Sequence, residues 1–144
     1  IKLGAALMSG AWMGSHLSND DLVKNSSFQK DYKTKILSRS SKEITLESVP
    51  HDDAAVVWGK VVTRIALPDM VPISQEFFDE QMVATRSMEF SEVRKISSRK
   101  IPLKIRVLPL DRQGEYTELI YDTLKFNTGL NKDFFSLTHL KTVR

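Results

Sequence analysis

The segment Gly10–Lys24, GAWMGSHLSNDDLVK, holds the densest group of potential metal ligands and catalytic side chains in the chain. The Asn-Asp-Asp run at 19–21 offers oxygen ligands, but a calcium loop also needs a distal Glu at set spacing, and Leu22 follows the run immediately. Ser18 directly before this run is typical of a helix start, because its hydroxyl caps the first turn and the acids suit its positive end. We therefore expect a short helix over 18–24 and no metal.

The remaining chemistry-bearing residues do not form a catalytic pattern. His16, His51 and His139 lie far apart in the sequence, without the spacing of a zinc site. Neither a GxSxG nucleophile elbow nor a glycine-rich phosphate loop is present. The chain has no cysteine, which excludes disulfides, thiolate metal sites and cysteine nucleophiles. We predict a protein that is not an enzyme and needs no cofactor.

Positive charge is concentrated in residues 91–106. The chain has a net charge of +3, but this segment alone carries +5, so the rest sums to −2. Such a segment is either a solvated sheet face or a contact surface for acidic partners, lipid head groups or nucleic acid. It contains no aromatic residue on which a base could stack, so we do not expect nucleic-acid binding. The candidates for head-group or partner contact are Arg99, Lys100, Lys104 and Arg106.

Methionine and aromatic side chains are spread along the whole sequence. Their simplest interpretation is a hydrophobic core, and the alternative is the lining of a cavity for an apolar ligand, since Met adapts to irregular space. The candidates for lipid contact are Met8, Trp12, Met13, Phe28, Trp58, Phe77, Met82, Met88 and Phe90.

Short apolar runs between turn-forming groups predict a β protein of one domain, residues 1–144. The runs predict strands at 30–39, 43–49, 56–67, 72–79, 82–90, 93–98, 102–108 and 115–127, with a further helical turn at 131–135. Strands at this spacing form a meander that curls into a sandwich or barrel.

Alternation assigns side chains to the faces of these strands. One inward set is Leu103, Ile105 and Val107; a second is Met82, Ala84, Met88 and Phe90, interrupted by Arg86; a third is Tyr116, Ile120, Leu124 and Phe126. No long amphipathic helix is available to cover the apolar face that results. The sheet must fold on itself or be covered by a missing segment, a partner or a ligand.

The order of several longer segments resembles a known family. WMGSHLSNDDLVKNSSFQKDY, WGKVVTRIALPDMVPISQEFFDE, MEFSEVRKISSRKIPLKIRVLP, GEYTELIYDTLKFN and DFFSLTHLK follow one another as in the bacterial outer-membrane lipoprotein-sorting proteins, which are similar to the periplasmic lipoprotein carriers. The resemblance covers nearly the whole chain. It implies a strongly curved antiparallel sheet, an unclosed barrel, with short helices on its concave side. It also implies that residues 1–144 are the C-terminal part of a longer domain.

The resemblance further implies a non-catalytic role in the periplasm. We expect binding of a lipid or lipoprotein acyl chain in an apolar cavity, followed by transfer to a membrane, an inner-membrane exporter or an outer-membrane acceptor. The alternative is an envelope protein-interaction module, or an adaptor for an exporter, without lipid cargo. An exposed apolar sheet face also makes a homodimer an expected outcome.

Overall fold

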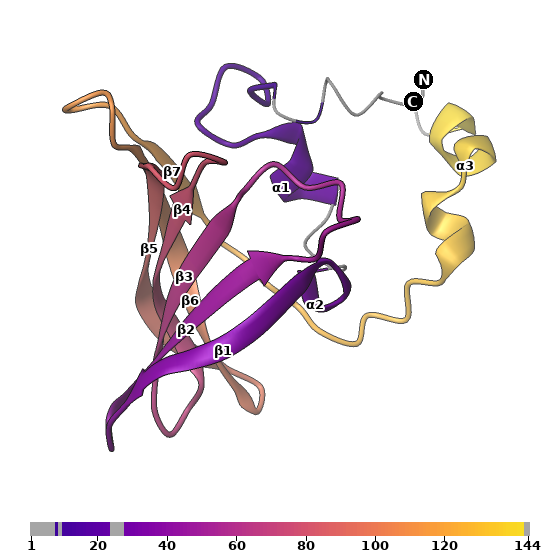
Figure 1. Ribbon diagram of the computed structural model, residues 1–144. Helices are drawn as coiled ribbons and strands as arrows, with labels where there is room; N and C mark the ends of the chain where they lie inside the picture. Colours follow the sequence, from indigo (N-terminus) through magenta and orange to yellow (C-terminus); the bar gives the residue numbers. More distant parts are fainter. Residues whose placement is uncertain (1–7, 9, 24–27, 143–144) are drawn as a thin grey trace.

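The computed structural model describes residue 8 and residues 10–23 and 28–142, and its main feature is one antiparallel sheet. Seven strands follow one another in chain order: β1 (Tyr32–Arg39), β2 (Glu43–Pro50), β3 (Lys60–Ala66), β4 (Val71–Phe78), β5 (Ala84–Ile96), β6 (Arg99–Pro109) and β7 (Thr117–Ile120). β1 and β7 are the two edges and do not pair with each other, so the barrel is not closed (Figure 1). The mainly β, unclosed antiparallel architecture is confirmed.

In the described part of the chain, four short helices accompany the sheet. α1 (Asn19–Val23) and α2 (Phe28–Asp31) lie on its concave side, while the 3-10 helix η2 (Lys132–Phe135) and α3 (Leu137–Thr142) follow an extended segment that leads away from β7 (Figure 1). The helices predicted over 18–24 and 131–135 are confirmed. Among the described residues, no helix has the length and apolarity required to cross a bilayer.

Irregular pairing at several points accompanies the curvature of the sheet. The pairing skips one residue each in β1, β4 and β5, namely Leu37, Ile73 and Thr85. A β-bulge bends its strand and increases the local twist. Shifts in three strands therefore favour a sheet that wraps around α1 and α2, as in Figure 1.

The core lies on the concave side and joins the sheet to the segment before α1. Its buried members come from five strands and from that segment: Leu17, Tyr32, Val61, Phe77, Met88 and Val107. Val61 and Val107 are fully buried. Residues 10–23, which we call the plug, thus provide part of the cover layer that the sequence analysis found missing.

Four of the predicted strands differ from the structure. The predicted strands 82–90 and 93–98 are one strand, β5, because β6 pairs with it in unchanged register on both sides of Glu92. The predicted strand 56–67 begins only at Lys60. The predicted strand 115–127 ends at Ile120, since β7 pairs with β6 over only four residues.

The predicted inward set on the last strand is wrong. β7 pairs Thr117 with Val107 and Leu119 with Ile105, so its odd-numbered residues share the face of the core. Tyr116 and Ile120 are accordingly 54% and 58% exposed.

Replacement of Val61 by Ala should lower the free energy of unfolding by about 2 kcal/mol, because two buried methyl groups are lost from a closely packed site. Val93→Ala makes the same chemical change at a position that is 47% exposed, and it should change stability much less. Urea denaturation of both variants measures the difference. Equal losses would contradict the assignment of the core to the concave face.

Candidate ligand-binding cavity

Cross-strand register assembles a mixed polar and apolar row on the concave face. Ser48 pairs with Val61, Val61 with Phe77, and Phe77 with Arg86, so these four side chains lie on the same face of β2 to β5. Arg86 is thus the residue that interrupts the inward apolar set of β5. It is only 5% exposed, which is rare for a charged side chain without a partner.

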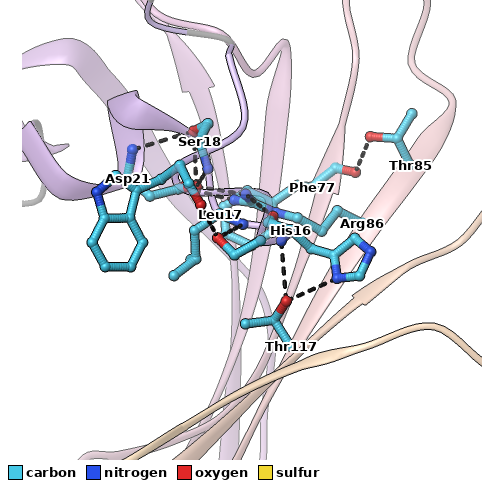
Figure 2. Close-up of polar contacts among 10 residues, drawn as sticks. His16, Leu17, Ser18, Asp21, Phe77, Thr85, Arg86 and Thr117 are labelled. Atoms are coloured by element: carbon cyan, nitrogen blue, oxygen red, sulfur yellow. Dashed lines mark hydrogen bonds and ion pairs between the residues drawn. The ribbon is translucent and has the colours of Figure 1, made fainter.

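The partner of Arg86 is Asp21 in the plug. The Nη1 of Arg86 donates to Oδ2 of Asp21 at 2.6 Å and its Nη2 donates to Oδ1 at 2.8 Å, so the pair is bidentate (Figure 2). Nη1 also approaches the carbonyl of His16 at 3.4 Å. A buried, bidentate ion pair therefore fixes the plug to the centre of the sheet.

Aromatic rings hold the guanidinium of Arg86 from the sides. Its Cζ lies 4.2 Å from the ring centroid of Phe77 and 4.4 Å from that of Trp58. A planar cation over aromatic faces in a desolvated site gains both electrostatic and packing energy. Arg86 consequently belongs to the apolar interior despite its charge.

Asp21 also closes the start of α1. Its Oδ2 accepts hydrogen bonds from the backbone N–H of Ser18 at 2.7 Å and from the Ser18 hydroxyl at 2.8 Å, and its own N–H donates to the Ser18 hydroxyl at 3.3 Å. This reciprocal arrangement is a capping box with Asp in the usual place of Glu. The predicted capping role of Ser18 is confirmed.

Burial disfavours the ionised form of Asp21, but the contacts of its carboxylate with Arg86 and Ser18 outweigh that effect. Desolvation alone would raise the pKa of the Asp21 carboxyl, but the hydrogen bonds and charge of Arg86, together with the Ser18 donors, hold this pKa below its ordinary value. Asp21 therefore stays ionised at neutral pH and keeps the ion pair intact.

A cavity of about 490 Å³ lies between the plug, α2 and the concave face. Five of the nine predicted lipid contacts line it: Phe28, Trp58, Phe77, Met88 and Phe90. The face assignment of Ile105 in the sequence also agrees, because Ile105 lines the same cavity.

The other four candidates do not line this cavity. Trp12 and Met13 lie in the plug and are 39% and 85% exposed, and Met82 is 52% exposed in the turn between β4 and β5. Met8 is half-buried, and its carbonyl accepts a hydrogen bond from the backbone N–H of Asp20 at 3.0 Å.

Several lining residues were not candidates in the sequence analysis, chiefly Leu17, Tyr32, Leu119 and Tyr121. Tyr32 stacks on Phe28 with 4.4 Å between ring centroids, and its hydroxyl donates to the Trp58 carbonyl at 3.3 Å. Burial, and then the nearby charges of Asp20 and Asp31, raise the pKa of Tyr32 to about 12. The phenol is therefore a neutral donor. Tyr32 and Leu119 could have been identified from the sequence only by a correct assignment of which alternate residues of β1 and β7 face the core.

A second cavity, of about 410 Å³, lies towards the loops 79–83 and 110–116 and shares Leu17 and Trp58 with the first. His16 lines it and links the plug to β7, because its Nδ1 lies 2.9 Å from the Thr117 hydroxyl and its Nε2 lies 3.2 Å from Oε2 of Glu115. The plug is thus attached at a second point, next to the ion pair (Figure 2).

The four basic candidates are separated by the structure. Lys104 and Arg106 both contact Glu118 on β7, at 2.8 and 2.7 Å, and these hydrogen bonds hold the pKa of Glu118 below its usual range. Lys100 pairs with Asp69 at 2.7 Å. The guanidinium of Arg99 lies 4.9 Å from the ring centroid of Phe126.

Within the part of the chain that the structure describes, no group of three or more His, Cys, Asp or Glu residues is placed to hold a metal ion. The candidate site is the cavity under the plug, whose lining is mainly apolar and also includes Asp20, Asp21 and Asp31.

Replacement of Arg86 by Met should lower the free energy of unfolding by about 3 kcal/mol, because the Asp21 carboxylate is left buried without its partner. The double variant Arg86→Met/Asp21→Asn should recover part of this loss. Arg64→Met is the matched control, because it also removes a bidentate contact to a carboxylate, that of Glu43. In this control pair the side chains are more exposed, 51% for Arg64 and 29% for Glu43. Chemical denaturation should show a much smaller loss for the control.

Stability should also depend on the ionisation of Asp21. Because the folded-state pKa of Asp21 is depressed, its contribution is complete above the unfolded-state pKa of about 4 and is lost as the pH falls through the folded value. When the pH is lowered below about 5, the free energy of unfolding of Asp21→Asn should therefore decrease less than that of the wild type. An unchanged acid dependence in this variant would contradict the role of the ion pair.

The fold recurs in solved structures that are longer than this chain. An outer membrane lipoprotein-sorting protein domain from Vibrio parahaemolyticus matches with a TM-score of 0.83 and 24% identity, over 96% of this chain and 59% of the other. A DUF1329 family protein from Desulfovibrio piger matches at 0.84 and 19% identity, over 94% and 57%. A LolA superfamily protein from Nitrosomonas europaea matches at 0.73 and 20% identity, over 92% and 60%.

A search of curated protein sequences finds no match. The structural matches confirm, at the level of the fold, the resemblance to lipoprotein-sorting proteins. The model of a protein family described as "Uncharacterized protein" matches residues 1–142. The chain therefore belongs to this family, and it has the fold of the lipoprotein-sorting domains.

Proposed function

We propose that the protein binds lipid or lipoprotein acyl chains in the cavity beneath the plug and carries them through the periplasm without catalysis. The observation that supports this most directly is the cavity of about 490 Å³ on the concave face, lined mainly by aliphatic and aromatic side chains. Its volume lies within the range of roughly 300–1,000 Å³ that is common for small-molecule sites. The lipoprotein-sorting description of one structural neighbour agrees with the proposal.

Burial of hydrocarbon provides enough affinity for this task. Each methylene that leaves water contributes about 0.8 kcal/mol, so a chain of ordinary length binds without any special polar contact. The neutral hydroxyl of Tyr32 adds a polar group that does not compete by ionising. The partners in this scheme are an inner-membrane exporter that supplies the cargo and an outer-membrane acceptor that receives it.

The two tryptophans of the chain make the cavity directly observable, since Trp58 lines it and Trp12 does not. A brominated fatty acid should quench the fluorescence of the Trp12→Phe variant, in which only Trp58 remains. It should quench the Trp58→Phe variant much less, because bromine acts only at short range. Equal quenching of both variants, or of neither, would contradict binding at this site.

A second test uses a variant that fills part of the cavity. Leu119→Trp places a larger side chain on its lining, whereas Ile120→Trp places the same side chain on the opposite, solvent-facing side of β7. Binding of a fluorescent fatty acid should weaken about tenfold or more for Leu119→Trp, since several methylenes lose their place, and should stay near the wild-type value for Ile120→Trp. Identical affinities, with no lipid found by native mass spectrometry, would favour the protein-interaction module instead.

A further inference from the structure

The meander places three hairpin turns, which are far apart in sequence, at one end of the sheet (Figure 1). These are residues 40–42 between β1 and β2, 67–70 between β3 and β4, and 97–98 between β5 and β6. Two contacts confirm that they are neighbours: the backbone N–H of Leu67 donates to the Lys42 carbonyl at 2.7 Å, and Lys100 Nζ lies 2.7 Å from Oδ2 of Asp69. We call this end, with the adjoining strand ends, the hairpin end.

The hairpin end collects basic side chains from two of its three hairpins, β1–β2 and β5–β6. Its cations are Arg39, Lys42, Arg94, Lys95, Arg99 and Lys100. Of the three acidic residues at this end, Glu43 and Asp69 already pair with Arg64 and Lys100, and Glu92 lies exposed next to Val93. Within the described chain, no ion pair engages the side chains of Arg39, Lys42, Arg94 or Lys95, and all four are exposed. The unpaired cations of the basic segment therefore lie at this end, whereas Lys104 and Arg106 are paired with Glu118.

The opposite end of the sheet has the reverse charge. Its three connections, residues 51–59, 79–83 and 110–116, carry the acidic residues Asp52, Asp53, Asp79, Glu80, Asp111 and Glu115 against a single cation, Arg112. The molecule is therefore polarised along the direction of its strands. A polarised charge distribution orients a protein in front of an oppositely charged surface.

Exposed apolar side chains accompany the cations of the hairpin end. Leu37, Met70 and Val93 are 50%, 60% and 47% exposed, and they come from the same three hairpins. Cations around apolar side chains are the composition of surfaces that bind at a lipid interface, where the cations attract anionic head groups and the apolar groups enter the boundary. A purely acidic protein partner would not require the apolar groups.

The cavity extends towards this end of the sheet. Arg86 and Asp21 hold the plug at the row that contains Phe77, whereas the lining residues Gln75, Met88 and Pro72 lie progressively nearer the hairpin turns. Pro72 is the second residue of β4, directly after the turn 67–70. The cavity therefore lies between the plug and the hairpin end.

From these observations we propose that the hairpin end is a docking surface for anionic lipid bilayers, with Arg39, Lys42, Arg94, Lys95 and Arg99 as its cations. Docking in this orientation brings the near side of the cavity close to the membrane and points the acidic end away from it. Docking on a bilayer does not require that the cavity hold lipid. The use of docking to transfer cargo, however, rests on the proposed function of the cavity.

The test compares two triple variants with the same change of charge in sedimentation with vesicles of phosphatidylcholine, with and without phosphatidylglycerol. Arg39→Gln/Arg94→Gln/Lys95→Gln removes cations of the hairpin end, and Lys30→Gln/Lys33→Gln/Lys141→Gln removes exposed cations elsewhere. The wild type should bind only the anionic vesicles, and less at high salt. The first variant should bind on the order of a hundredfold more weakly, since each cation contributes about fivefold, and the second should change little.

If both triple variants bound the anionic vesicles equally weakly, the net charge of the protein and not the hairpin end would determine binding, and the proposal would be overturned. Failure of the wild type to bind anionic vesicles would also overturn it, and an acidic protein partner would then be the better explanation for the cations. Quenching of Trp58 by brominated fatty acid, measured in the same variants, separates the two proposals. It should be unchanged in the hairpin-end variant, and its absence in the wild type would contradict the cavity function while leaving docking intact.

Discussion

The buried ion pair between Arg86 and Asp21 is the contact on which the arrangement of this protein depends. It joins a five-residue helix, too short to be stable alone, to the middle of a curved sheet. Two charges in an apolar interior are tolerated only because the geometry is bidentate, Ser18 donates to the same carboxylate, and two aromatic rings cover the guanidinium. The contacts of His16 with Thr117 and Glu115 and the burial of Leu17 in the core hold the plug in the same position.

Placement of the plug decides what the concave face can do. Leu17 completes the core beneath the plug, next to Val61 and Phe77, and the part of the face nearer the hairpin turns keeps open space. The same side chains therefore serve two purposes: Phe77 and Met88 are core residues on one side and cavity lining on the other. The described residues contain only short helices, which cover part of the concave face and leave this space open.

The antiparallel meander also sorts charge without any special motif. Alternate connections of a meander lie at opposite ends of the sheet, so basic hairpins and acidic loops that alternate along the sequence become two separate, oppositely charged ends. The charged outer face lies between them, where Glu118 pairs with both Lys104 and Arg106. The part of the cavity nearest the hairpin turns thereby lies on the same side of the plug as the free cations.

Local signals located most of the strands, α1, the inward face of β6 and that of β5 beyond Arg86, because side-chain alternation and helix capping depend only on neighbours in the chain. The predicted inward set of β5 is wrong at Ala84, which pairs with Phe78 across a register shift, and at Met82, which lies in the preceding turn. The same signals failed at β7, where the pairing with β6 sets both the length and the phase of the strand. Five cavity residues could be selected by type, but Trp12, Met13 and Met82 have the same types and lie elsewhere. The sequence by itself determined an unclosed β-sheet with an apolar face and a capped helix beside it. Only the tertiary structure decided that Arg86 binds Asp21 and that cations from separate hairpins meet, since both follow from register between segments up to 65 residues apart.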